Sequence, residues 1–311
     1  MRMRDLGVVA AFMCAMASPA TAQDTPDALP LAQNAPKPVY TTEAMLRRIA
    51  PEQNAALGYW MAFAQMKEPP SGSFGPDVID ANAAALTTLA RASRGGFCDW
   101  GIDYELGPAA PIAHLPKARV LASVNSAAAV RAMARGQADP AVDQWLVGMR
   151  FASHIESGGT LISTLTAWSA LRSTWEGLEP FIAEGRLTSA QRARLADAIR
   201  AMPETVFNWP GAVLNEARVL QSPAALAATK SGSGAFTPPT AAETKRFLRE
   251  IERVADALSR SPDQAAVTIA AYQAEGDVHR FYRESMPSLT RVNENRREVK
   301  AARERLLAAL K

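Results

Sequence analysis

Apolar residues recur at intervals of three and four along nearly all of the chain after residue 50, which is the spacing of one face of an α-helix. The clearest case starts at Pro51, a residue suited to a first helical turn, and runs to Met66. Its apolar side chains lie on almost every face, as in a buried helix. Alanine is abundant and β-branched runs are scarce. The pattern predicts an all-α fold.

Capping residues and glycines mark where further helices begin and end. Thr188, Thr240 and Ser261 each precede Gln or Glu by three residues, which is the spacing of a capping box. Short breaks between helices favour antiparallel neighbours, so we expect helical hairpins stacked in a tetratricopeptide-like or irregular solenoid or bundle. Other helices are expected over 77–93, 115–135, 139–157, from Thr160 onwards, from Pro210, and over 289–311.

The N-terminus has the three parts of a secretory signal peptide. Two arginines lie in the first four residues, the apolar run Leu6–Met16 follows, and small residues lead to a cleavage site between Ala22 and Gln23. The apolar run is far shorter than the roughly 20 residues of a membrane-spanning helix. We therefore expect export to the periplasm or the extracellular space, with no transmembrane span in the mature chain.

Composition changes divide the rest of the chain. Residues 23–41 are rich in proline and aperiodic, which predicts a disordered or extended leader after the signal peptide at 1–22. Residues 42–229 are expected to form a helical-hairpin domain. Glycine, serine and proline at 230–239 predict a linker or loop, and 240–311 are expected to add C-terminal helices packed on the same body.

Charge and cysteine content exclude some classes of function. The formal net charge is only +3, so no strong field would draw the chain to nucleic acid or anionic lipid. One of the two cysteines, Cys14, lies in the signal peptide. The mature chain then keeps Cys98 alone and has no internal disulfide, so its stability must come from apolar burial.

Two resemblances are carried by the first half of the chain. Residues 119–157 resemble a tetratricopeptide hairpin, with Gly136 at its turn and Ala141, Trp145 and Gly148 where that repeat places small, aromatic and small residues. The chain is also similar to a group of exported, uncharacterised bacterial α-helical proteins with a Cys-Asp-Trp motif. That likeness rests on four stretches: Asn54–Tyr59, Cys98–Trp100, His114–Ala122 and Gly159–Ser163. It implies a helical fold and export, and no activity.

Common catalytic motifs are absent from the sequence. It contains no G-x-S-x-G, H-E-x-x-H, C-x-x-C, Walker A or G-x-G-x-x-G pattern. The three histidines, His114, His154 and His279, are far apart in sequence and predict surface or capping groups rather than metal ligands. We therefore expect no metal site and no cofactor.

The segment Phe97–Pro108, FCDWGIDYELGP, lacks helical periodicity and allows two interpretations. In the first, Cys98 is a nucleophile with His114 or His154 as its base. In the second, which we favour, the segment is a strap: its apolar residues pack on the helices, and Cys98 is a small buried hydrophobe. Aspartate and glycine around Trp100 are typical of a turn. On this interpretation Asp103 and Glu105 would meet Lys117 or Arg119.

Three other features are candidates for binding. Gly158-Gly159-Thr160 could hold an anion at a helix N-terminus, although an ordinary helix break is the commoner cause. Trp168 and Trp175, like Trp100, Asp103 and Glu105, are candidate ligand-binding residues, although a tryptophan stripe on a helix usually belongs to the core. Interleaved arginine, lysine and glutamate after Leu289 predict a solvated, salt-bridged face that includes Arg296.

Two functions from different classes follow from these patterns. The favoured one is a non-catalytic exported scaffold that binds a protein or peptide partner through stacked hairpins. The alternative is a small periplasmic hydrolase that uses Cys98 with a histidine, or a metal-assisted site. The position of Cys98 separates the two, because a nucleophile must be accessible and within hydrogen-bond reach of its base.

Overall fold

Helices make up almost all regular structure in the computed structural model, which describes residues 54–67, 74–228, 237–276 and 278–311. These residues belong to one unit, Leu46–Lys311. They contain no strand beyond an isolated bridge between Asn54 and Phe97, so the predicted all-α fold is confirmed. The signal peptide, the leader and most of the predicted linker at 230–239 lie outside the described residues. Within the described part, no helix is long and apolar enough to cross a membrane.

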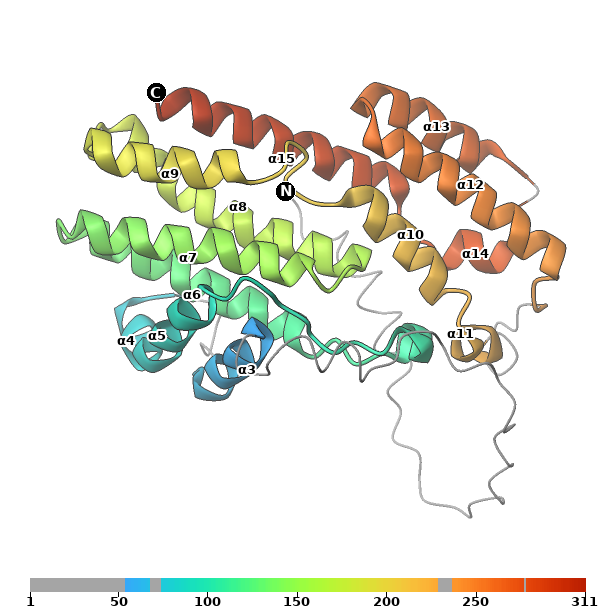
Figure 1. Ribbon diagram of the computed structural model, residues 1–311, viewed down its shortest axis with the longest axis horizontal. Coiled ribbons are helices and arrows are strands. Elements are labelled where there is room, and N and C mark those ends of the chain that lie inside the picture. The colour runs from blue at the N-terminus through green and yellow to red at the C-terminus, as the bar shows by residue number, and fades with distance from the viewer. Residues whose placement is uncertain (1–53, 68–73, 229–236, 277) are drawn as a thin grey trace, which may run out of the picture. The chain divides into compact units, whose positions relative to one another are not determined.

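Three long helices form the centre of the fold (Figure 1), and α6 packs against both α7 and α8 while α7 packs against α8. The turn between α6 and α7 contains Gly136 at φ +76°, a conformation that favours glycine. Ala141 and Trp145 of the expected hairpin are fully buried. A Cβ at Gly148 would lie 2.5 Å from Thr174 Oγ1, so this glycine permits close contact with α8. The bounds are α6 His114–Ala134, α7 Ala138–Glu156 and α8 Leu161–Ala183.

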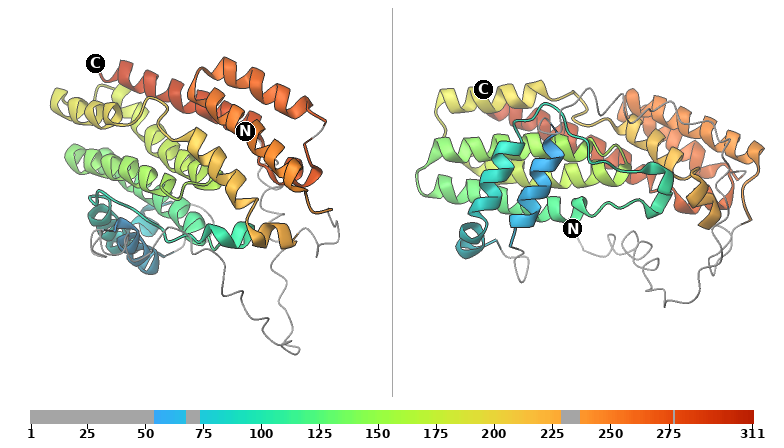
Figure 2. Two further views of the ribbon diagram at one scale, coloured as in Figure 1. Left: turned by 45° about the vertical axis from the view of Figure 1, so that its right-hand side comes forward. Right: turned by 60° about the horizontal axis from the view of Figure 1, so that its bottom comes forward.

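In the described part of the chain, three shorter helices precede the centre, and in the right-hand view of Figure 2 α3 and α5 lie across the axes of α6 and α7. The single helix expected over 77–93 is wrong: Asn82 divides it. The Asn82 side chain is fully buried, accepts from Lys67 N at 2.8 Å and donates to the carbonyl oxygens of Lys67 and Val78. These bonds to the backbone favour a break over a continuous helix. The bounds are α3 Ala55–Gln65, α4 Pro76–Ala81 and α5 Ala83–Ala92.

The strap, Phe97–Pro108, lies in the connection between α5 and α6 and includes all but the last residue of the short 3₁₀ helix η2, Tyr104–Ala109. In Figure 1 it is the teal coil that runs from α5 to the neighbourhood of α11. Contacts between η2 and both α10 and α11 hold its far end. A Cβ at Gly107, φ +57°, would meet Ser222 Oγ at 2.4 Å, so only glycine fits there without a shift.

The C-terminal helices pack on the same central layer. Helix α15 contacts α8, α9 and α13, and α10 contacts both α8 and α12. Helix α12 buries Phe247, Ile251, Val254 and Leu258, which share one face at helical spacing. The bounds are α9 Ser189–Ala201, α10 Trp209–Val219, α11 Pro223–Ala228, α12 Ala241–Ser259, α13 Pro262–Ala274, α14 Arg280–Ser285 and α15 Leu289–Ala309.

The expected solvated face of α15 is wrong at Arg296, which is only 3% exposed. Its Nη2 donates to the carbonyl oxygen of Arg260 at 2.6 Å, and burial lowers its pKa. The neighbouring cations of α15 bond to other elements: Arg297 to Asp263, Lys300 to Glu204, and Arg303 to the Ile199 carbonyl. One side of this charged helix is therefore a packing surface against the loops next to α9, α12 and α13.

Candidate functional site

Trp100 anchors the strap to the helical body. Its side chain is 7% exposed, and its indole N–H donates to the carbonyl oxygen of His154 at 2.6 Å. The ring stacks on His114 at 4.4 Å between centroids, with Tyr59 and Phe63 stacked at 5.6 and 6.2 Å. Trp100 thus joins the first turn of α6, the last turn of α7 and the inner face of α3.

The start of the strap is bonded to the N-terminus of α3. Ala55 N donates to the Phe97 carbonyl at 2.9 Å, and the Asn54 side chain both donates to the Asp99 carbonyl and accepts from Asp99 N, each at 2.9 Å. Asp99 Oδ1 in turn accepts from Gly101 N, and Gly101 has φ +66°. This is the aspartate–glycine turn that the sequence predicts.

Cys98 lies beneath this part of the strap and is 8% exposed. Burial raises the pKa of its thiol to about 12; a hydrogen bond with Ser157 opposes the rise and the charge of Asp99 adds to it. A nucleophilic cysteine needs a lowered pKa and access to solvent. The described residues contain no hydrogen bond from Cys98 to His114 or His154. This geometry gives no support to a hydrolase built on Cys98.

The imidazole of His154 forms a part-buried hydrogen bond with Tyr59 of α3. Its Nδ1 lies 2.5 Å from the Tyr59 hydroxyl, and Tyr59 is fully buried. Burial lowers the pKa of His154, opposed by a hydrogen bond with the Gly95 backbone and assisted by the charge of Arg150. Burial also raises the pKa of Tyr59, so the phenol stays protonated and its O–H donates a hydrogen bond to Nδ1.

His114 and His279 have different environments. The surface or capping position expected for His114 is wrong: it is 1% exposed, its Nε2 has no hydrogen-bond partner among the described residues, and burial lowers its pKa to about 4. His279 is a capping group, as expected, because its Nδ1 accepts from Phe281 N at the start of α14.

The acidic residues of the strap act locally. Asp103 Oδ1 accepts from Glu105 N at 3.0 Å and so caps η2, while both side chains are exposed. The expected ion pairs with Lys117 or Arg119 are not formed among the described residues. Between the two acids, the Tyr104 hydroxyl donates to the Gly158 carbonyl, which links the strap to the turn before α8.

Trp168 and Trp175 lie in the core of α8, 5% and 2% exposed. Their rings meet edge to face at 6.1 Å between centroids. A ligand that stacks on a tryptophan needs an open ring face, and these rings offer almost none. The tryptophan stripe is therefore a packing feature.

The glycine turn before α8 is already occupied by a carboxyl group of the chain itself. Glu216 Oε2, from α10, accepts from Leu161 N at 3.2 Å, and Thr160 caps the same helix by accepting from Ser163 N. Glu156 likewise accepts from Asn208 N at the start of α10. Burial raises the pKa of both glutamates. This N-terminus is thus closed to an external anion, and nothing in the sequence had indicated Glu216.

A groove between α4, α6 and α8, here called the α4–α6 groove, has a volume of about 480 Å³. Small residues Ser126, Ala127 and Ser173 leave room between apolar side chains of α4 and α6. Arg131 donates to both carboxylate oxygens of Asp80, at 2.8 and 3.0 Å, so its charge is neutralised. The groove is lined by Phe74, Pro76, Ile79, Ser123, Ser126, Ala127, Val130, Arg131, Ser173 and Glu176.

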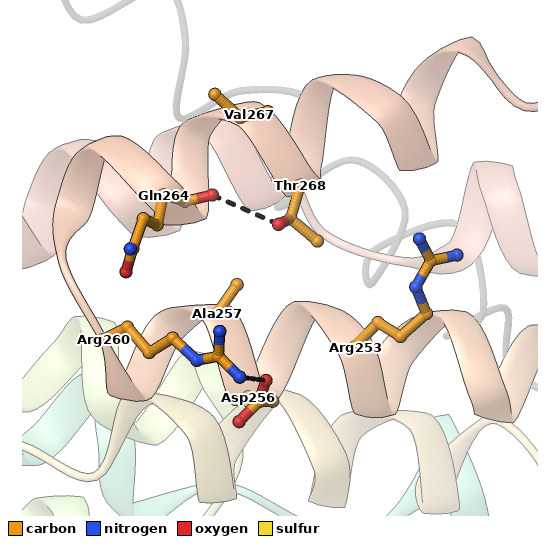
Figure 3. Close-up of a pocket in the computed structure, with 7 residues that line it drawn as sticks. All are labelled: Arg253, Asp256, Ala257, Arg260, Gln264, Val267 and Thr268. Atoms are coloured by element: carbon orange, nitrogen blue, oxygen red, sulfur yellow. Dashed lines mark hydrogen bonds and ion pairs between the residues drawn. The ribbon is translucent and has the colours of Figure 1, made fainter.

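A second hollow of about 380 Å³ lies between α12 and α13 (Figure 3). Arg253 and Arg260 flank it from the α12 side, and each already pairs with a carboxylate, Glu250 at 2.8 Å and Asp256 at 2.6 Å. Val267, on the opposite side, is 73% exposed. Its cations are paired, as Arg131 of the α4–α6 groove is, but its apolar side chain Val267 is open to solvent, so we do not take this hollow as the candidate site.

Metal ligands are not gathered anywhere in the described part of the chain, where no group of three or more His, Cys, Asp or Glu side chains is placed to hold an ion. We take the α4–α6 groove as the candidate binding site, because its volume lies in the range of known binding pockets and its lining includes Phe74, Ile79 and Val130. Compared with family models, curated proteins and solved structures, the chain matches none of them.

Proposed function

We propose that the chain is a non-catalytic helical scaffold that binds an extended peptide segment in the α4–α6 groove. The observation that carries the proposal is the groove of about 480 Å³ between α4, α6 and α8. The burial of Cys98 and His114 supports it, because these two side chains serve the packing of the strap and Cys98 is not accessible as a nucleophile.

The chemistry of the groove defines the occupant. Phe74, Ile79 and Val130 give it apolar walls, and the side chains between them are small, so we expect it to take one apolar side chain of a peptide. Arg131 is paired with Asp80, and Glu176 lies 3.7 Å from Arg172, so neither offers a free charge. We expect a peptide recognised by an apolar anchor, with an affinity that changes little with salt concentration.

This function is tested by selecting peptides from a random displayed library against the full chain. The affinity of each selected peptide is then measured by calorimetric titration. Ala127→Trp fills the groove and should weaken binding by about tenfold or more, which corresponds to about 1.4 kcal/mol. Ala134→Trp is the matched control, because Ala134 is exposed on the same helix outside the groove and should leave affinity unchanged. Failure to select any peptide, or equal binding by both variants, would contradict the proposal.

We also propose that the protein acts outside the cytoplasm, after cleavage between Ala22 and Gln23. The residues concerned lie outside the described part, so this rests on the basic start, the short apolar run and the small residues before the site. The expected mature N-terminus is Gln23. Intact mass of the protein recovered from the producing cells decides it, and a stable membrane-bound species that retains Met1 would contradict cleavage.

A further inference from the structure

Two histidines hold the same tryptophan of the strap from two different helices. His114, the first residue of α6, stacks on the Trp100 ring at an interplanar angle of 17°. His154, in the last turn of α7, offers its carbonyl oxygen to the Trp100 indole and its imidazole to the Tyr59 hydroxyl. A change in either imidazole therefore acts directly on the contact that anchors the strap.

Among the described residues, no anionic side chain lies near His114 to offset the charge of an added proton. Its ring faces Trp100 and, edge to face at 6.2 Å, Trp60. Burial is the only cause of its lowered pKa, so no charged side chain of a neighbouring element contributes. A second N–H on this ring would place a cation in an almost fully buried position, and such burial is costly without a partner.

The surroundings of His154 also oppose a second proton. Nδ1 already accepts from Tyr59 on α3, and burial of the ring outweighs the hydrogen bond with the Gly95 backbone, which by itself favours the charged ring. The charged side chain that acts on it is Arg150 of α7, a cation. If Nδ1 of His154 were protonated it could no longer accept from Tyr59, and the hydroxyl hydrogen of this fully buried residue would need another acceptor.

We propose that protonation of His114 and His154 releases the strap from α3, α6 and α7 and thereby opens access to Cys98. The docked strap requires neutral imidazoles, and the released strap allows ordinary solvated ones. Because the pKa of both histidines is lower in the docked state, docking is fully stable above the ordinary value of 6.5. It weakens as the pH falls from 6.5 towards the docked value of about 4 for His114.

The rate at which Cys98 reacts with a dipyridyl disulfide measures strap opening. The full chain carrying Cys14→Ser leaves Cys98 as its only thiol, and glutathione under the same conditions gives the intrinsic rate at each pH. The ratio of the two rates should rise by about tenfold or more between pH 7 and pH 4.5, since protonation of His114 alone favours the open form on this scale. Circular dichroism at each pH should show unchanged helix content.

Substitutions of the histidines distinguish release of the strap by histidine protonation from a general loss of structure in acid. His114→Phe keeps the stacked ring and His154→Asn keeps an acceptor for Tyr59, and neither side chain titrates in this range, so the double variant should lose the pH dependence. His279→Asn alters the cap of α14 alone and should retain it. A flat ratio in the parent chain, an equal rise in the double variant, or loss of helix at the same pH as labelling would overturn the proposal.

Discussion

Replacing Trp100 by alanine is expected to lower the free energy of unfolding by about 3–5 kcal/mol, the usual cost of truncating a buried tryptophan. The substitution removes the stacking on His114 and Tyr59 and the hydrogen bond to the His154 carbonyl. It also leaves that carbonyl oxygen with one donor fewer at a half-buried position. Urea denaturation followed by circular dichroism measures the loss as a lower midpoint with little change in slope.

Two further variants test the cause of this loss. Trp100→Phe keeps an aromatic ring in the stack and loses only the indole hydrogen bond, so it should cost much less than Trp100→Ala. Cys98→Ala replaces one small buried group by another and should be milder still. A Trp100→Ala protein with the parent midpoint would show that the strap is not docked and would reopen the case for an accessible Cys98.

Trp145→Ala should destabilise the chain to a similar extent, about 3–5 kcal/mol, for a different reason. Trp145 is fully buried on α7, contacts Phe181 at 5.8 Å between ring centroids, and fills the space between α6 and α8. Its loss leaves a cavity at the centre of the three-helix layer. Thermal and urea unfolding should both show the effect.

Trp145→Phe tests whether the indole N–H of Trp145 contributes to stability. The indole Nε1 has no hydrogen-bond partner among the described residues, so phenylalanine removes a buried polar group that contributes no bond. It should therefore recover most of the stability lost in Trp145→Ala. If both variants lost the same amount, the indole N–H would have a partner of importance, such as an ordered water.

Local signals predicted local structure well. The capping boxes at Thr188, Thr240 and Ser261 are all formed, with each side chain bonded to the backbone three residues on. The aspartate turn at Gly101 is another case, because its atoms are two residues apart. Such features depend on neighbours in sequence, and a single sequence contains those neighbours. The all-α class follows from the same local periodicity.

Features made by distant residues could not be predicted. Asn82 reads as an ordinary helix residue until Lys67 is placed beside it, and Glu216 has no visible role until α10 meets the start of α8. The pairing of Tyr59 with His154 joins residues 95 positions apart. The α4–α6 groove likewise exists only after three helices have packed. Periodicity shows which face of a helix is apolar, not which helix will cover it.

The position of the strap in the chain has a consequence for the order of assembly. The strap leaves the ribosome before α6, yet Trp100 and Tyr104 bond to residues 54 positions further on, and Gly107 contacts α11, which is later still. Tyr59 and Phe63 of α3 are made before the strap, but its partners on α6, α7 and α11 are not, so its apolar side chains are only partly covered until those helices have formed. Docking of the strap should therefore be completed only after α11 has formed, and until then Phe97–Pro108 exposes apolar side chains that a chaperone could bind.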